Sequence, residues 1–179
     1  MAWRRSGFDS PWVHKKILRP PKSRPIVDMD NIKAIIFDWG RTLFDSETKK
    51  EFSDAEQILT LCMERGYRLT LASLANIFTP KERMKQIEGS PLWNFFEIVV
   101  VINKDKDKIL DEIVLKLNLP RNEILIVDDR VIRGIKYGNL RGHPTAWLQK
   151  GKFANELPNA ETKSPSFIIH SLAELANII

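Results

Sequence analysis

The sequence contains one cysteine, Cys62, and no apolar run near the roughly 18 residues that a membrane-spanning helix requires. A single cysteine excludes an internal disulfide, and its position in an apolar helical run favours a buried thiol in a reducing compartment over a reactive nucleophile. The first twenty residues carry five basic side chains but lack the apolar segment of a secretory signal. We therefore expect a cytoplasmic protein that does not cross a membrane.

Histidines are also few. His14, His143 and His170 are scattered along the chain without metal-binding spacing, and there is no internal repeat or low-complexity stretch. Of the 179 residues, 43% are apolar and 28% are charged, which is typical of a globular domain with a single core. We expect a monomer or a small homo-oligomer.

The basic charge is concentrated at the N-terminus. The net charge is +5, but residues 1–30 hold seven basic and three acidic side chains, which leaves only +1 for the rest. This difference predicts a basic arm over residues 1–30 and a domain over residues 31–179. The arm contains Trp3, Phe8 and Trp12, and aromatics among basic residues can bind nucleic acid or a protein partner. We prefer the alternative, in which these aromatics pack on the domain, because nothing else indicates a nucleic-acid module.

From Asn31 onward, short apolar runs alternate with amphipathic ones. The runs typical of strands are residues 32–37, 67–72, 96–102, 124–127, 145–148 and 166–169. The runs typical of helices are residues 54–66, 80–87, 107–119, 130–140 and 171–178. Alternation of strands and helices predicts a parallel, Rossmann-like sheet in a three-layer α/β/α sandwich.

Polar residues follow the first four predicted strands. They are Asp38, Ser73, a lysine-rich segment at residues 103–108, and the pair Asp128-Asp129. Each one alone can be a turn, a helix cap or a solvated loop. In parallel sheets, however, ligands bind at the carboxyl ends of the strands, where all four stations would meet. Their succession therefore predicts a phosphate and metal site.

The four stations have complementary chemistry. The Asp38 carboxylate can attack phosphorus and accept the phosphoryl group. Asp38, Asp128 and Asp129, with the carbonyl of Gly40, offer the hard oxygen ligands that Mg²⁺ prefers. Ser73 can donate to a phosphoryl oxygen, and a lysine can neutralise charge in the transition state.

The same residues carry a resemblance to a known family. Asp38-Trp39-Gly40-Arg41-Thr42 is similar to the first motif of the haloacid dehalogenase (HAD) superfamily, Asp-x-Asp-x-Thr. Ser73, a lysine before a helix and Asp128-Asp129 are similar to the other three motifs, so the match spans about residues 32–179. The resemblance implies a HAD-type sheet and an Mg²⁺-dependent phosphohydrolase that forms an aspartyl-phosphate on Asp38.

The third motif has two competing registers. Alignment of the following helix with capless relatives selects Lys106, whereas alignment with the commoner Lys-Pro-Asp-Pro form selects Lys104. We prefer Lys106 and keep Lys104 as the alternative catalytic lysine.

Gly40 departs from the family pattern. The phosphatases of the family have an aspartate here, which protonates the leaving group and later activates water, and glycine can do neither. Trp39, Arg41 and Thr42 are the substrate-binding candidates, with Trp39 and Arg41 on either side of Gly40. Trp39 has the equally good alternative of packing beneath the loop.

The short intervals between motifs leave no room for a sizeable cap domain. In this family an open, capless site implies a large or macromolecular phosphorylated substrate, and Gly40 favours one with a good leaving group. The alternative is a catalytically degenerate domain that binds a phosphorylated ligand or a protein partner.

Overall fold

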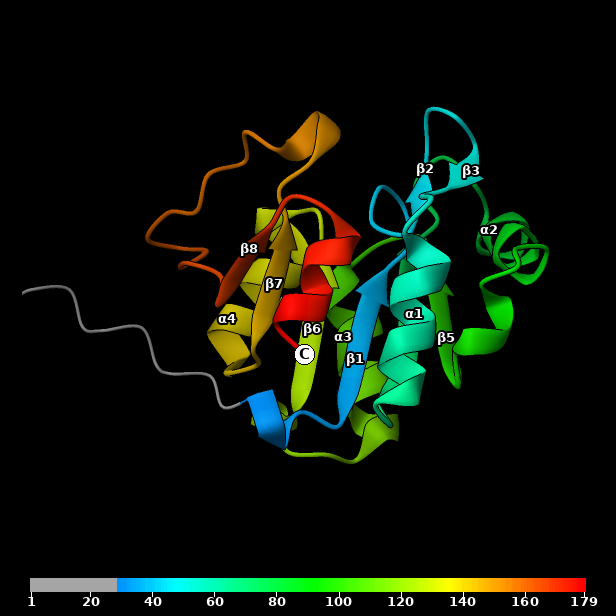
Figure 1. Cartoon of the computed structure of the whole chain (residues 1–179). Helices are drawn as coiled ribbons and strands as arrows, with labels where there is room; N and C mark the ends of the chain where they lie inside the picture. Colours follow the sequence, from blue (N-terminus) through cyan, green and yellow to red (C-terminus); the bar gives the residue numbers. More distant parts are fainter. Residues whose placement is uncertain (1–28) are drawn as a thin grey trace, which may run out of the picture.

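A computed structural model describes residues 29–179 as an α/β domain built on a six-stranded sheet (Figure 1). The order is β5-β4-β1-β6-β7-β8, and every neighbouring pair is parallel. The strands are β1 Ala34–Asp38, β4 Arg68–Leu74, β5 Ile98–Ile102, β6 Ile124–Asp128, β7 Thr145–Leu148 and β8 Phe167–Ile169. This confirms the predicted parallel sheet. The predicted arm lies outside the described residues except for its last two.

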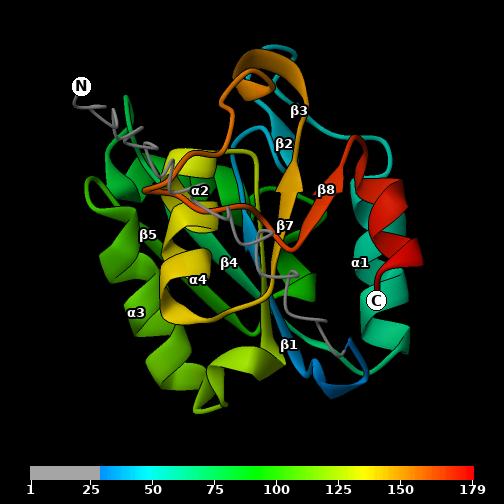
Figure 2. The same cartoon turned by 90° about the vertical axis from the view of Figure 1, so that its left-hand side faces the viewer.

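The helices cover both faces of the sheet (Figure 2). They are α1 Ala55–Glu64, α2 Pro80–Glu88, α3 Lys106–Leu117 and α4 Lys136–Arg141. A 3₁₀ helix, η6 Leu172–Asn177, packs beside α1 on one face, and α3 and α4 cover the other. The result is the three-layer sandwich that the strand–helix alternation predicts.

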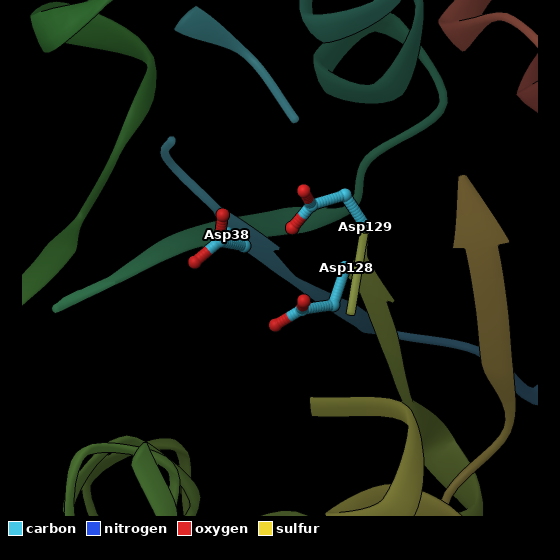
Figure 3. A group of neighbouring side chains, drawn as sticks. All are labelled: Asp38, Asp128 and Asp129. Atoms are coloured by element: carbon cyan, nitrogen blue, oxygen red, sulfur yellow. The ribbon is translucent and has the colours of Figure 1, made fainter. Parts of the chain in front are cut away.

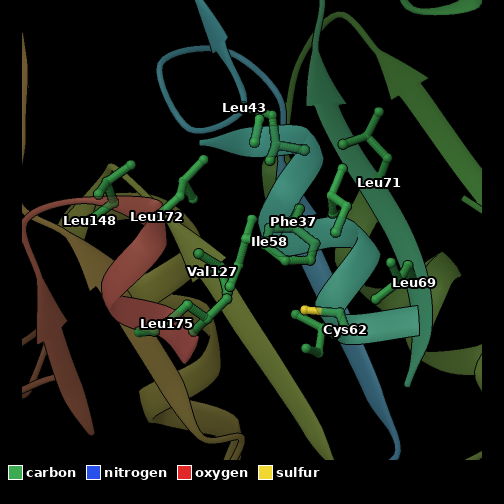
Figure 4. Close-up of a cluster of buried hydrophobic side chains, with 14 of the residues drawn as sticks. Phe37, Leu43, Ile58, Cys62, Leu69, Leu71, Val127, Leu148, Leu172 and Leu175 are labelled. Carbon is green, nitrogen blue, oxygen red and sulfur yellow. The ribbon is translucent and has the colours of Figure 1, made fainter. Parts of the chain in front are cut away.

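Each face of the sheet has its own apolar core. β1 and β6 are central and almost completely buried, which explains their continuous apolar runs. Side chains of α1 and η6 meet one face of these strands around Phe37, Leu71 and Leu175 (Figure 4). Cys62 lies in this cluster as predicted, and burial raises the pKa of its thiol to about 12.

Two predicted helices differ from the structure. The segment predicted as a helix over residues 130–140 begins with a π-helical turn, η4 Val131–Ile135, before α4. There the backbone at Gly134 passes so close to the side chain of Asp128, the last residue of β6, that a Cβ on Gly134 would lie 2.4 Å from Asp128 Oδ2. The C-terminal segment is 3₁₀ rather than α-helical, and its buried Leu172 and Leu175 are three residues apart, the repeat of a 3₁₀ helix.

A short antiparallel hairpin was not predicted. It consists of β2 Phe44–Asp45 and β3 Lys50–Glu51, and its strands are too short to give a periodic pattern. It follows the loop that leaves β1 and stands above the carboxyl end of the sheet (Figure 1).

Within residues 29–179, no helix combines the length and the apolar character that crossing a membrane requires.

Candidate active site

The candidate site lies where the direction of strand succession reverses. From β1 the chain proceeds to β4 and β5 on one side, and then returns to β6, β7 and β8 on the other. β1 and β6 are therefore neighbours across the switch point, where open α/β sheets bind ligands. Their register pairs Phe37 with Val127, so the next residues, Asp38 and Asp128, emerge side by side.

Three carboxylates converge at this point. One oxygen each from Asp38, Asp128 and Asp129 lies within 4.8 Å of the others (Figure 3). Asp128 and Asp129 are each 2% exposed. Burial, followed by the charges of Asp38 and Asp128, raises the pKa of Asp129 to about 9. Burial likewise raises the pKa of Asp128 to about 6, although Lys106 opposes it. Three carboxylates this close repel one another unless a cation or a proton neutralises them.

Lys106 is the lysine that reaches these carboxylates. It is the first residue of α3, and its ammonium donates to Asp38 and, at 2.8 Å, to the carbonyl of Ala72. It lies 3.5 Å from Asp128. Burial alone would lower the pKa of Lys106, but the charges of Asp38 and Asp128 raise it above its ordinary value. Lys104 is exposed two residues earlier, so the structure favours the register that selects Lys106.

Two predicted substrate-binding residues lie beneath the site instead of in it. Thr42 is fully buried and its hydroxyl donates to Asp38 Oδ2 at 3.3 Å, a position that orients the carboxylate. Trp39 is also fully buried and stacks on Phe44, with ring centroids 5.3 Å apart. Neither lines the cavity above Asp38, and their role as substrate contacts stays a prediction. The packing alternative for Trp39 describes its position.

A cavity of about 320 Å³ opens above the carboxylates. The predicted residues that line it are Asp38, Gly40, Arg41, Ser73, Asp128 and Asp129. A side chain could be accommodated at Gly40, since the nearest atom to an added Cβ would be Ser46 Oγ at 3.8 Å. Lack of space for a Cβ therefore does not explain why glycine stands here instead of the family's aspartate.

Several basic side chains of the cavity wall were missed by the sequence reasoning. They are Lys49, Arg83 and Arg133, and Arg130, which follows the acidic pair in the sequence, lies on the same wall. Arg130 is paired with Glu156 at 2.6 Å and lies over the ring of Phe153 at 3.6 Å, so the segment after β7 forms part of the wall. Arg83 did leave a signal, because it occupies the buried face of α2 four residues before Ile87. An arginine at an apolar position of an amphipathic helix is unusual and can indicate a site.

The acidic cluster fits a hard divalent cation. Its ligand atoms are carboxylate oxygens, which Mg²⁺ prefers. One of them, Asp129 Oδ2, is buried without a hydrogen-bond partner in the described part of the chain. A cation would supply the missing partner and relieve the repulsion within the cluster.

No family model matches this chain, and no curated protein matches it. Solved structures do resemble it at a TM-score of 0.66. One is a HAD-type hydrolase from Bacillus subtilis bound to magnesium, at 14% identity over 82% of this chain and 98% of that one. Another is an L-2-haloacid dehalogenase from Xanthobacter autotrophicus with chloropropionic acid covalently bound, at 12% identity over the same shares. A third, described as a predicted phosphatase, is from Clostridium acetobutylicum, at 14% identity over 82% and 97%. At these identities the likeness shows the HAD-type fold.

Proposed function

We propose that this protein is a phosphohydrolase of the HAD type in which Asp38 accepts the phosphoryl group of the substrate. The observation that carries the proposal is the setting of Asp38. Its carboxylate lines the cavity, accepts hydrogen bonds from Lys106 and Thr42, and lies within 4.8 Å of Asp128 and Asp129. Magnesium dependence and a phosphorylated substrate are part of this proposal.

The first chemical step is attack by one Asp38 oxygen on phosphorus. The new bond joins that oxygen to phosphorus, and the bond from phosphorus to the leaving oxygen breaks with its electron pair going to the leaving group. Lys106, which contacts Asp38, and Ser73, which lines the cavity, would stabilise the charge on the phosphoryl oxygens. In the second step a water oxygen bonds to phosphorus, and the bond from phosphorus to the Asp38 oxygen breaks with its electron pair returning to the carboxylate. Phosphate leaves, and the proton of the water passes to solvent.

Asp38, Asp128, Asp129 and the carbonyl of Gly40 would hold Mg²⁺. When bound, the ion supplies positive charge to the phosphoryl oxygens and screens the carboxylates from one another.

Gly40 determines which substrates suit this site. Without a carboxyl group at this position, the leaving group must depart with little help from a proton donor, a loss of about 10²–10⁴ in rate. Acyl phosphates have stable leaving groups and suffer least. Between Asp38 and Ser73 the chain contains only the β2–β3 hairpin and α1, which supports an open, capless site for a large phosphorylated substrate.

Hydrolysis of two simple substrates tests the proposal. With Mg²⁺ present, acetyl phosphate should be hydrolysed much faster than ethyl phosphate, and Asp38→Asn should abolish both activities. Absence of Asp38-dependent turnover on either substrate, and on a panel of phosphorylated macromolecules, would contradict it. Gly40 favours a second candidate, a binding domain without catalysis, which predicts retained binding of Mg²⁺ and phosphate in that case.

A further inference from the structure

Arg83 is a buried cation that faces the cavity. It lies in α2, is 6% exposed, and lines the same cavity as Asp38. Its Nη1 donates to Gln86 Oε1 at 2.6 Å, but its Nε is buried without a hydrogen-bond partner in the described residues. Most of the donors of this guanidinium are therefore not used by the described part of the protein.

No carboxylate in residues 29–179 forms an ion pair with Arg83 within 4.0 Å. The nearby carboxylate of Asp38 does favour the charged form of Arg83, but Asp38 is already paired with Lys106. Arg130, on the same cavity wall, is neutralised by Glu156. A buried charge without a counterion is unfavourable, so the position of Arg83 is best explained by an anion that arrives with the ligand.

The guanidinium is held in place before any ligand binds. α2 begins with a capping box between Thr79 and Glu82 and has Pro80 in its first turn, which fixes the start of the helix. The guanidinium carbon lies 4.7 Å from the ring centroid of Phe78, and Gln86 holds it through Nη1. A guanidinium fixed in this way can bind both oxygens of a carboxylate or phosphate.

The phosphoryl group has other partners in the proposed reaction. Lys106 contacts Asp38, and Ser73, Asp128 and Asp129 line the cavity beside it, whereas Arg83 does not contact Asp38 as an ion pair. Arg41 and Arg133 add further positive charge to the cavity wall.

We infer that Arg83 binds a second anionic group of the substrate, a carboxylate or a second phosphate, beside the phosphoryl group that Asp38 accepts. The inference rests on the proposed function and defines its substrate class as phosphorylated molecules with another oxyanion close to the reacting phosphate. Arg83 is a specificity residue in this account.

Calorimetric binding in a variant that cannot turn over tests the inference. Asp38→Asn in the full chain, with Mg²⁺, is titrated with ethyl phosphate, phosphoglycolate and ethylene glycol bisphosphate. We expect phosphoglycolate and ethylene glycol bisphosphate, which each carry a second anionic group, to bind more tightly than ethyl phosphate. Adding Arg83→Gln should weaken them about tenfold or more, as expected for losing a charged hydrogen-bond pair, and weaken ethyl phosphate less than threefold. The ligand that loses more affinity identifies carboxylate or phosphate as the preferred group.

Lys85→Gln is the matched control, because Lys85 lies on the same helix, is exposed, and does not line the cavity. It should leave all three affinities unchanged, and Arg83→Lys should restore part of the loss. Arg83→Gln should not lower the melting temperature, since it removes a buried unpaired charge. The inference is overturned if Asp38→Asn binds all three ligands with equal affinity or shows no measurable binding. It is also overturned if Arg83→Gln weakens all three ligands equally. If the ligands with a second anionic group are still preferred but the wild-type protein hydrolyses no phosphorylated substrate, only the proposed function is contradicted.

Discussion

The floor and the wall of the cavity are built in different ways. The floor carries Asp38 and Asp128-Asp129 from the ends of β1 and β6, with Lys106 at the start of α3, and it holds an excess of buried carboxylates. The wall carries basic side chains from loops and from α2, including Arg83 and Arg130. Strand register fixes the floor, whereas loop and helix packing determine the wall. In the proposed function, the floor carries out the reaction and the wall selects the substrate.

The largest expected effect distinguishes Lys106 from Lys104. Lys106→Met removes the buried ammonium that contacts Asp38, and acetyl phosphate hydrolysis should fall by about 10²–10³, as when a transition-state donor is lost. Lys104→Met, at the exposed position two residues earlier, should leave the rate within about twofold. Steady-state rates with circular dichroism of both variants provide the measurement. Equal losses of hydrolysis rate in the two variants would contradict the assignment of Lys106 as the lysine of the site.

An intermediate effect is expected when the missing carboxyl group is restored. A Cβ at Gly40 meets no close contact, and Gly40→Asp should increase ethyl phosphate hydrolysis by about 10-fold to 100-fold, a part of what general acid catalysis supplies. Acetyl phosphate hydrolysis should change less, because its leaving group needs little protonation and only the attack of water on the phosphorylated Asp38 gains a base. Gly40→Asn is the matched control, with similar volume and no proton-transfer ability. An equal gain from both variants would show that the effect is not acid catalysis.

The smallest expected effect is on stability and concerns Asp129. Its pKa is raised from 3.8 to about 9, so between these values the folded protein retains a proton that the unfolded chain has released. The free energy of unfolding of the metal-free protein should therefore fall as the pH rises through this window, and Mg²⁺ should oppose the fall. Asp129→Asn should raise the metal-free melting temperature at pH 8 by a few degrees and abolish the Mg²⁺-dependent increase.

Thermal unfolding with EDTA and with Mg²⁺, at several pH values, measures both effects. A glutamate elsewhere on the surface serves for comparison: Glu88→Gln, on the exposed side of α2, should change neither the pH dependence nor the response to Mg²⁺. A metal-free protein that gains stability between pH 5 and pH 8 would contradict the account of the cluster.

The floor of the site was predictable from the sequence because its residues directly follow buried strands. The apolar runs before Asp38 and Asp128 identify both strand ends, and a parallel sheet places such ends at one edge. The predicted fold is confirmed in its layers and its parallel sheet. The roles assigned to the floor residues stay predictions, although the structure brings them together.

The wall could not be predicted in the same way. The hairpin β2–β3 has two-residue strands with no periodicity, and the turn of η4 depends on the approach of Gly134 to Asp128. Arg83 belongs to none of the motifs, and only tertiary packing brings α2 to the cavity. Trp39 illustrates the converse, because its position next to Asp38 in sequence does not place it in the cavity.

Direct detection of the phosphorylated enzyme tests the central claim most sharply. The protein is mixed with acetyl phosphate and Mg²⁺, quenched in acid within milliseconds to seconds, digested, and analysed by mass spectrometry. The account predicts that the peptide containing Asp38 gains the mass of one phosphoryl group, that hydroxylamine removes it, and that Asp38→Asn prevents it. Turnover of acetyl phosphate without any phosphoryl group on that peptide, at every quench time, would contradict the claim that Asp38 is the nucleophile.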